Sequence, residues 1–273
     1  MTVLERLNAL RELMREKKID AYLVPTDDFH GSEYVGDYFK CRKYITGFTG
    51  SAGTAVIMQD MAGLWTDGRY FLQAADQLEG STIQLFKMGE PDVPTVHEFL
   101  ADKLEKGMCL GFDGRTVSAK EAEELAELLK EKEITFAVND DLIGAIWSDR
   151  PALSCEPAME LDVKWAGESR ADKIAKIREQ MKEKKADYFV LTSLDDIAWF
   201  LNIRGNDVHC CPVVLSYLVM TDKELRLFAN VDVFSEEIRV NLEADGVEIY
   251  PYDDVYSYVQ TIAAGKKVLL SRA

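Results

Sequence analysis

The sequence predicts an α/β protein made of two tandem, related domains, each a mixed β-sheet flanked by helices. Helical and strand patterns alternate along the chain, one order of elements occurs twice, and 273 residues suit one large domain or two modest ones. The composition is 47% hydrophobic, which is enough to build a packed core.

Each predicted domain opens with a helix, a short turn and a buried strand. These elements cover 4–14, 17–20 and 21–24 in the first copy and 174–181, 184–187 and 188–191 in the second. Ile19 corresponds to Ala186, and the same offset relates the helices and strands on either side of this pair. An acidic pair, Asp27-Asp28 or Asp195-Asp196, follows each strand and predicts a turn.

The similarity continues downstream with different spacing. Gly50 corresponds to Gly205, a smaller offset than that between Ile19 and Ala186, so the first copy carries an extra segment around 32–44. The strands that follow are 54–58 and 213–220. A helix, a glycine and a strand then cover 96–106, Gly107 and 108–112 in the first copy, and 255–264, Gly265 and 267–271 in the second. Three blocks in one order favour a duplication over two unrelated αβ segments.

The two copies differ after these last glycines. The first continues as far as Trp147, with a helix capped by Ser118 and a strand over 134–138. The second stops at Ala273, soon after its last predicted strand, and we expect it to be truncated. Residues 148–168 predict a linker, and Ser169 predicts the N-cap of the next helix. The predicted domains are residues 1–155 and residues 165–273.

Charge and cysteine content exclude several classes of protein. The net charge of −16 disfavours nucleic acid and anionic membranes as partners. No apolar stretch reaches the roughly 18 residues of a spanning helix, and the N-terminal residues lack the apolar region of a signal peptide. The five cysteines fit neither a disulfide framework nor a Cys-x-x-Cys metal site. We therefore expect a reduced, cytoplasmic protein.

No enzyme signature is present, and two motifs that attract notice have simpler explanations. The glycine-rich segment 47–53 fits no nucleotide fingerprint and is explained by backbone turns. The run His209-Cys210-Cys211 contains metal-binding residue types, but adjacent side chains on a strand face opposite ways, and a tetrahedral site needs four ligands. We assign no catalytic residue and no metal ligand.

Acidic residues follow several predicted strands. Asp27-Asp28 and Asp195-Asp196, together with Asp67 and Asp113, could converge at one sheet edge, where carboxylates can hold divalent cations for hydrolysis. The alternative is turn chemistry, because Asp bonds to the backbone two residues on. A metal-dependent acidic hydrolase therefore remains one of the functions to test.

Arg69 is the strongest candidate for binding a ligand. It follows the turn Asp67-Gly68 between a predicted strand and a predicted helix, where a guanidinium can present its planar fork to a carboxylate or peptide carbonyl. The alternative is an ion pair with Asp67 or Glu33. His30 and Tyr34, in the extra segment of the first copy, are candidates for the same surface.

Four segments resemble a known family. Residues 27–34 (DDFHGSEY), 47–55 (GFTGSAGTA) and 64–74 (LWTDGRYFLQA) are similar to the first domain of the long, three-domain Xaa-Pro aminopeptidases, of the pita-bread metallopeptidase family. Residues 194–208 (LDDIAWFLNIRGNDV) are similar to their second domain. The resemblance covers nearly the whole chain.

The resemblance implies two creatinase-type domains of ribonuclease-H-like topology, followed in the parent enzyme by a catalytic domain. That domain holds two divalent metal ions, usually manganese, and removes the residue before a penultimate proline. The resemblance implies that this chain lacks it, holds no cofactor itself and is catalytically silent. It implies as partners the missing C-terminal catalytic domain, proline-containing peptides in the complete enzyme and a second copy in a homodimer. It assigns substrate binding to Arg69, with His30 as its neighbour.

We therefore expect a non-catalytic region that narrows access to the active site and contributes oligomer contacts. The alternative is a stand-alone binding or regulatory module derived from the same domains. The coding sequence beyond Ala273 would distinguish the two.

Overall fold

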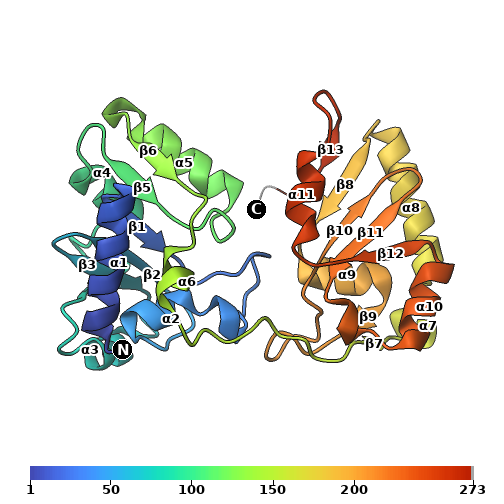
Figure 1. Ribbon diagram of the computed structural model, residues 1–273, viewed down its shortest axis with the longest axis horizontal. Helices are drawn as coiled ribbons and strands as arrows, with labels where there is room; N and C mark the ends of the chain where they lie inside the picture. Colours follow the sequence, from blue (N-terminus) through green and yellow to red (C-terminus); the bar gives the residue numbers. More distant parts are fainter. Residues whose placement is uncertain (272–273) are drawn as a thin grey trace. The chain divides into compact units, whose positions relative to one another are not determined.

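The computed structural model describes residues 1–271 and contains two compact units, divided between Ala152 and Leu153 (Figure 1). Each unit is a mixed sheet flanked by helices, which confirms the predicted fold class. Within the described residues, none of the helices combines the length and the apolar composition needed to span a membrane. The predicted second domain runs to Ala273, so its last two residues lie outside the described part of the chain.

The first unit holds a six-stranded sheet. Its strands are β1 (Ala21–Val24), β2 (Thr54–Met58), β3 (Ala62–Thr66), β4 (Gln84–Lys87), β5 (Cys109–Gly111) and β6 (Thr135–Ala137), in the order β4-β3-β2-β1-β5-β6. Its helices are α1 (Val3–Lys17), α2 (Cys41–Thr46), α3 (Phe71–Gln77), α4 (Val96–Lys103), α5 (Ala119–Leu129) and α6 (Leu142–Ile146). Strand β2 runs opposite to the other five.

Helices cover both faces of this sheet, because side chains alternate along each strand. Tyr22 on β1 belongs to a buried cluster that includes residues of α1, α2, α3 and α6. Its neighbours Ala21 and Leu23 belong to the cluster formed with α4 and α5. All four residues of β1 are buried. Helices therefore pack on both faces of the strand that precedes Asp27.

The second unit repeats this plan. Its strands are β7 (Met159–Glu160), β8 (Tyr188–Leu191), β9 (Ile203–Arg204), β10 (Ser216–Met220), β11 (Leu225–Ala229), β12 (Val247–Tyr250) and β13 (Val268–Leu269). Its helices are α7 (Val163–Ala166), α8 (Arg170–Glu183), α9 (Leu194–Leu201), α10 (Glu236–Ala244) and α11 (Asp254–Gln260). The sheet order β12-β11-β10-β8-β13 matches β4-β3-β2-β1-β5, and β10 runs opposite to its companions as β2 does.

The duplication extends to individual hydrogen bonds where α1 and α8 end. Lys18 and Lys185 both take left-handed backbone conformations, with φ of 57° and 52°. The following amides of Ile19 and Ala186 each return to a helix carbonyl, of Met14 and Met181 respectively, at 2.8 Å. The correspondence between Ile19 and Ala186 read from the sequence therefore describes equivalent backbone positions.

The first strand of each sheet is joined to its parallel neighbour in the same way. The Asp20 carboxylate accepts a hydrogen bond from the Cys109 amide at 2.7 Å. The Asp187 carboxylate accepts one from the Lys267 amide at 2.8 Å. An aspartate before the strand thus fixes the register of β5 against β1 and of β13 against β8.

A cation stacked on an aromatic ring also recurs. Arg6 lies 4.3 Å from the Tyr44 ring centroid and donates to the Tyr44 carbonyl at 2.7 Å. Lys173 lies 4.3 Å from the Trp199 ring and donates to the Trp199 carbonyl at 2.6 Å. Helices α1 and α8 therefore each donate to a carbonyl in the last turn of another helix, α2 and α9 respectively, where helix carbonyls lack intrahelical partners.

Several predicted boundaries were wrong. Helix α4 ends at Lys103, not at residue 106, and Gly107 lies in the turn beyond it with φ of 83°. The side chain of Lys132 donates to the carbonyls of Ala101 and Leu104. These carbonyls thus have hydrogen-bond partners although the helix ends before residue 106. The predicted helix 255–264 is α11, and the predicted strand 213–220 starts at Ser216.

The acidic pair Asp195-Asp196 does not form a turn. It occupies the first turn of α9, where Ser193 is the N-cap and negative charge is favourable. The predicted linker 148–168 is likewise partly structured, because it contains α7 and also β7, which pairs with β9. Ser169 caps α8 as predicted.

The second copy has an insertion of its own. Val56 and Val219 occupy equivalent register positions, and their offset is larger than that between Gly50 and Gly205. A short extra segment therefore lies between Gly205 and β10. It includes His209-Cys210-Cys211, which we expected on a strand. The run lies in a turn instead, closed by the Cys211 amide on the Val208 carbonyl at 3.0 Å.

Candidate functional site

One edge of the first sheet collects the candidate residues. Because β2 runs against its neighbours, its amino end lies beside the carboxyl ends of β1 and β3, and β5 is parallel to β1. Asp27, Asp67 and Asp113 follow these carboxyl ends, and the glycine-rich segment precedes β2. The expectation of one shared edge is thus confirmed for Asp27, Asp67 and Asp113. It is wrong for Asp195-Asp196, which follow β8 in the sheet of the second unit. We call the edge in the first unit the site edge: residues 25–32, 47–53, 66–70 and 112–116.

Arg69 is held at the site edge by Asp67. Its Nε and Nη2 donate to the two carboxylate oxygens at 2.9 and 2.8 Å, and its amide donates to Oδ1 at 3.0 Å. These hydrogen bonds lower the pKa of Asp67 to about 2. The ion pair offered as the alternative is therefore present, but the Arg69 side chain is 68% exposed. Three of the five guanidinium N–H groups lie outside the pair.

A buried arginine, which sequence reasoning missed, organises the glycine-rich segment. Arg42 on α2 is 3% exposed and donates to the Thr26 hydroxyl at 2.8 Å, to the Phe48 carbonyl at 2.6 Å and to the Gly50 carbonyl. Burial lowers the pKa of Arg42 to about 10, so it stays charged at neutral pH. Its position just before the glycine-rich segment was the only signal of this role in the sequence.

The glycine-rich segment in turn contacts the turn that carries Arg69. The Ser51 and Tyr70 hydroxyls lie 2.7 Å apart, and the Thr66 hydroxyl donates to the Ala52 carbonyl at 2.7 Å. A Cβ at Gly50 would lie 2.2 Å from the Phe48 ring and 2.8 Å from the Tyr70 ring, so this close packing requires glycine. Arg42 holds the glycine-rich segment, and that segment contacts Tyr70, the residue next to Arg69.

His30 has a different environment. It is 8% exposed, and its amide donates to Oδ1 of Asp28 at 2.8 Å, as the Ser32 amide does at 3.0 Å. Tyr34, farther along, is 46% exposed. The hydrogen bonds that Arg69 donates to Asp67 raise the pKa of Arg69, and Tyr34 adds electrostatically to that rise. The structure therefore exposes Arg69 and buries His30; substrate binding by either stays a prediction.

A small cavity opens beside Asp27. It measures about 20 Å³, room for roughly one water molecule, and Asp113, Asp141 and Arg150 also line it. Burial raises the pKa of Asp27 to about 6. Asp113 pairs with Arg115 at 2.8 Å, and Asp141 with Arg150 at 2.5 Å.

These contacts do not support the acidic hydrolase considered above. Asp67 does not line the cavity shared by Asp27 and Asp113, and both Asp67 and Asp113 are occupied by arginines. Over residues 1–271, no group of three or more His, Cys, Asp or Glu side chains could hold a metal ion. The described residues therefore provide no cage for a divalent cation.

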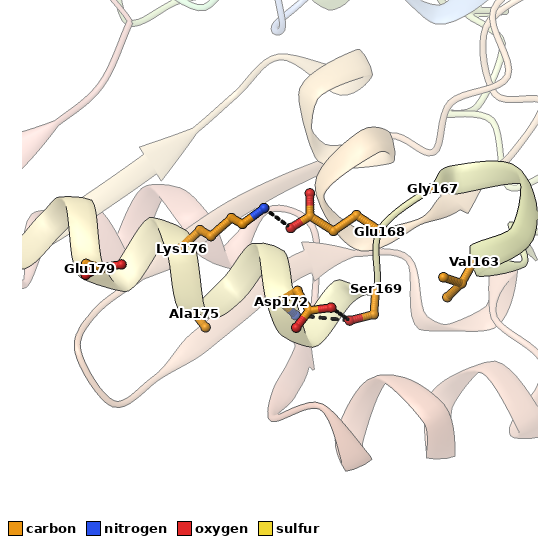
Figure 2. A pocket seen from close by; sticks show the side chains of 8 residues that line it. All are labelled: Val163, Gly167, Glu168, Ser169, Asp172, Ala175, Lys176 and Glu179. Atoms are coloured by element: carbon orange, nitrogen blue, oxygen red, sulfur yellow. Dashed lines mark hydrogen bonds and ion pairs between the residues drawn. The ribbon is translucent and has the colours of Figure 1, made fainter.

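Figure 2 shows an open groove in the second unit, at the start of α8. Its polar groups bond to one another. The Ser169 hydroxyl donates to Asp172 at 2.6 Å and accepts from the Asp172 amide at 3.1 Å, while Lys176 pairs with Glu168 at 2.5 Å. The Ser169–Asp172 contacts in this groove are explained by the capping of α8.

Comparison with known families identifies both units. Residues 6–143 match the creatinase/prolidase N-terminal domain, and residues 149–273 match a second profile of that description. The chain belongs to the creatinase/prolidase N-terminal domain family. Both copies of this family's domain are present in tandem, so the duplication and the resemblance inferred from sequence are confirmed.

Similar proteins are Xaa-Pro aminopeptidases. Aminopeptidase P2 of Arabidopsis thaliana is 41% identical over 271 residues, 97% of this chain and 38% of the relative. A probable Xaa-Pro aminopeptidase P of Laccaria bicolor is 41% identical over 261 residues, 95% of this chain and 40% of the relative. This creatinase/prolidase pair is homologous to the N-terminal portion of such enzymes.

A solved structure agrees. The X-prolyl aminopeptidase of Caenorhabditis elegans, described as a cytosolic enzyme with a di-nuclear active site, matches with a TM-score of 0.90 and 37% identity. The match covers 95% of this chain and 44% of that one. The chain spans less than half the length of the relatives it matches.

Proposed function

We propose that this chain is the non-catalytic N-terminal region of a cytoplasmic Xaa-Pro aminopeptidase. In that role it shapes access of proline-containing peptides and contributes contacts to a homodimer. Its partner is a catalytic domain that carries two divalent metal ions, usually manganese. The supporting observation is 41% identity to aminopeptidase P2 across 97% of this chain.

Arg69 is the residue that we propose to bind the peptide. Asp67 holds its guanidinium by two parallel hydrogen bonds, so little side-chain freedom is left to lose on binding. The remaining N–H groups suit a peptide carbonyl or a terminal carboxylate. We propose His30 as a buried neighbour that supports this surface rather than a direct ligand.

Residues 1–271 do not fit the metal pair, because they hold no suitable cluster of ligands. We therefore expect the purified 273-residue chain to release no residue from an Xaa-Pro peptide with manganese present. Turnover by this chain alone, measured by liberated amino acid, would contradict the non-catalytic role.

The role of Arg69 can be tested in a chimera in which this chain replaces the matching segment of the C. elegans enzyme. We expect Arg69→Ala to raise KM for an Xaa-Pro tripeptide about tenfold, with kcat changed by less than about twofold, because a charge-assisted hydrogen bond is lost. The KM of Arg69→Lys should lie between those of Arg69→Ala and the parent chimera, since lysine keeps the charge but lacks the planar fork of the guanidinium.

The chain offers a matched control. Asp113-Gly114-Arg115 repeats the geometry of the Arg69 turn, with Nε–Oδ1 and Nη2–Oδ2 distances of 2.9 and 2.8 Å. Arg115→Ala should raise KM less than Arg69→Ala does, because the Arg115 side chain is 35% exposed whereas that of Arg69 is 68% exposed. Equal KM values for Arg69→Ala and the parent chimera would show that Arg69 does not bind substrate. A parent chimera that is folded but inactive would count against the proposed function.

A further inference from the structure

Two consecutive thiols lie in the insertion that the second copy alone carries. Cys210 is exposed, Cys211 is half-buried, and neither forms a disulfide. Both belong to the turn that starts at Val208. The proposed function does not use this pair of thiols.

The base of the insertion is buried and hydrogen-bonded. Asp207 is 6% exposed, and its carboxylate accepts from the amides of Glu156 at 3.1 Å and Leu215 at 2.8 Å. Val208 is 2% exposed. The two thiols therefore follow directly on a segment that is buried and bonded on both sides.

The backbone allows the two sulfurs to face the same way. Cys210 has φ of 65°, in the left-handed region, so the alternation of side chains along a strand does not apply. Pro212 restricts Cys211 to extended conformations. Their Cα atoms are about 3.8 Å apart, less than an unstrained disulfide spans. Such a disulfide is easily reduced, so in a reducing compartment the pair stays a dithiol.

We propose that Cys210 and Cys211 form a modification site that captures a soft, thiol-seeking centre such as trivalent arsenic through both sulfurs. With an arsenoxide, R–As=O, two As–S bonds form and the As=O bond breaks. The oxygen leaves as water with both thiol protons, and no electrons are transferred. Soft thiolate ligands favour such centres, whereas zinc needs further ligands that residues 1–271 do not supply.

Two of the three other cysteines make good references. Burial raises the pKa of Cys41 to about 12, which keeps it from reacting as a thiolate. Cys155 is exposed but has no cysteine beside it in the sequence. We expect Cys155 to bind the same reagent through one sulfur, a bond that an added monothiol displaces.

The test is labelling of the full chain with phenylarsine oxide, followed by mass spectrometry before and after excess 2-mercaptoethanol. We expect one phenylarsenic group per chain to survive the monothiol and to leave with 2,3-dimercaptopropanol. Closure of a two-sulfur ring should make monothiol release at least about 100-fold slower than from a single thiol.

Cys210→Ser and Cys211→Ser should each lose the monothiol-resistant label, and Cys155→Ser should retain it. Circular dichroism should be unchanged in all three, since the sites lie at the surface or in a turn. A wild-type label removed by the monothiol, or a resistant label that persists in Cys210→Ser, would overturn the proposal.

Discussion

Arg42 lies buried in α2 and donates to three neutral oxygens, those of Thr26, Phe48 and Gly50. A buried charge without a carboxylate is stable only while its hydrogen bonds are complete. Removing the guanidinium would also leave three acceptors unpaired in the glycine-rich segment. At the scale of single residues, Arg42 therefore contributes stability and Arg69 is the exposed residue it indirectly supports.

We expect Arg42→Met to lower the free energy of unfolding of the first unit by about 2–4 kcal/mol, because several buried acceptors lose their donor. Arg42→Lys should recover part of this loss. Urea unfolding followed by fluorescence measures the effect. Arg6→Met, which removes one hydrogen bond to Tyr44, is the control and should cost about 1 kcal/mol; equal losses would contradict the role given to Arg42.

Asp27 predicts a pH dependence of stability. Its pKa is raised to about 6 by burial, whereas an unfolded Asp ionises near about 3.9. Between these values the folded chain binds more protons, so the free energy of unfolding falls as pH rises from 4 to 6. Asp27→Asn should abolish this fall, measured by urea unfolding at several pH values.

Asp67→Asn is the matched control. The hydrogen bonds from Arg69 lower the pKa of Asp67 to about 2, so its contribution is complete above pH 4 and is lost only as pH falls toward 2. The difference in the free energy of unfolding between Asp67→Asn and wild type should therefore be constant between pH 5 and 7. A slope that is equally steep in wild type and Asp27→Asn would assign the dependence to another group.

At the scale of elements, α1 and α8 end in the same strained way. Lys18 and Lys185 occupy left-handed backbone that glycine adopts without steric cost. We expect Lys18→Gly and Lys185→Gly each to raise the free energy of unfolding by about 0.5–1 kcal/mol, seen as a higher urea midpoint. Lys17→Gly, at a position that is still helical in α1, should lower it by about 1 kcal/mol. The same sign at positions 17 and 18 would contradict this account.

The starts of α5 and α8 were predictable from sequence, whereas the end of α4 was not. Ser118 and Ser169 cap the helices that follow them through bonds within three residues. The end of α4 depends on Lys132, which is distant in the sequence, so it was placed too late. At the site, the turn of Arg69 followed from the local Asp-Gly pair, but the burial of Arg42 depends on tertiary acceptors that no local pattern reveals.

At the scale of the whole molecule, each unit has its own core. The two buried clusters described for the first unit draw on residues between 3 and 147, all within that unit. A domain with a complete core folds by itself. We expect residues 1–152 expressed alone to give a dispersed NMR spectrum and cooperative unfolding; a collapsed spectrum without a transition would show that the core is insufficient.

Both insertions occupy the same rim of their sheets. The first copy gains residues after the carboxyl end of β1, and the second gains them before the amino end of β10, which lies beside the carboxyl end of β8 because Leu191 pairs with Leu218. Length can change at that rim without shifting any strand pairing. Two copies of one duplicated domain can therefore carry loops of different length on the same sheet. We expect the lengths of related chains to vary most at that rim.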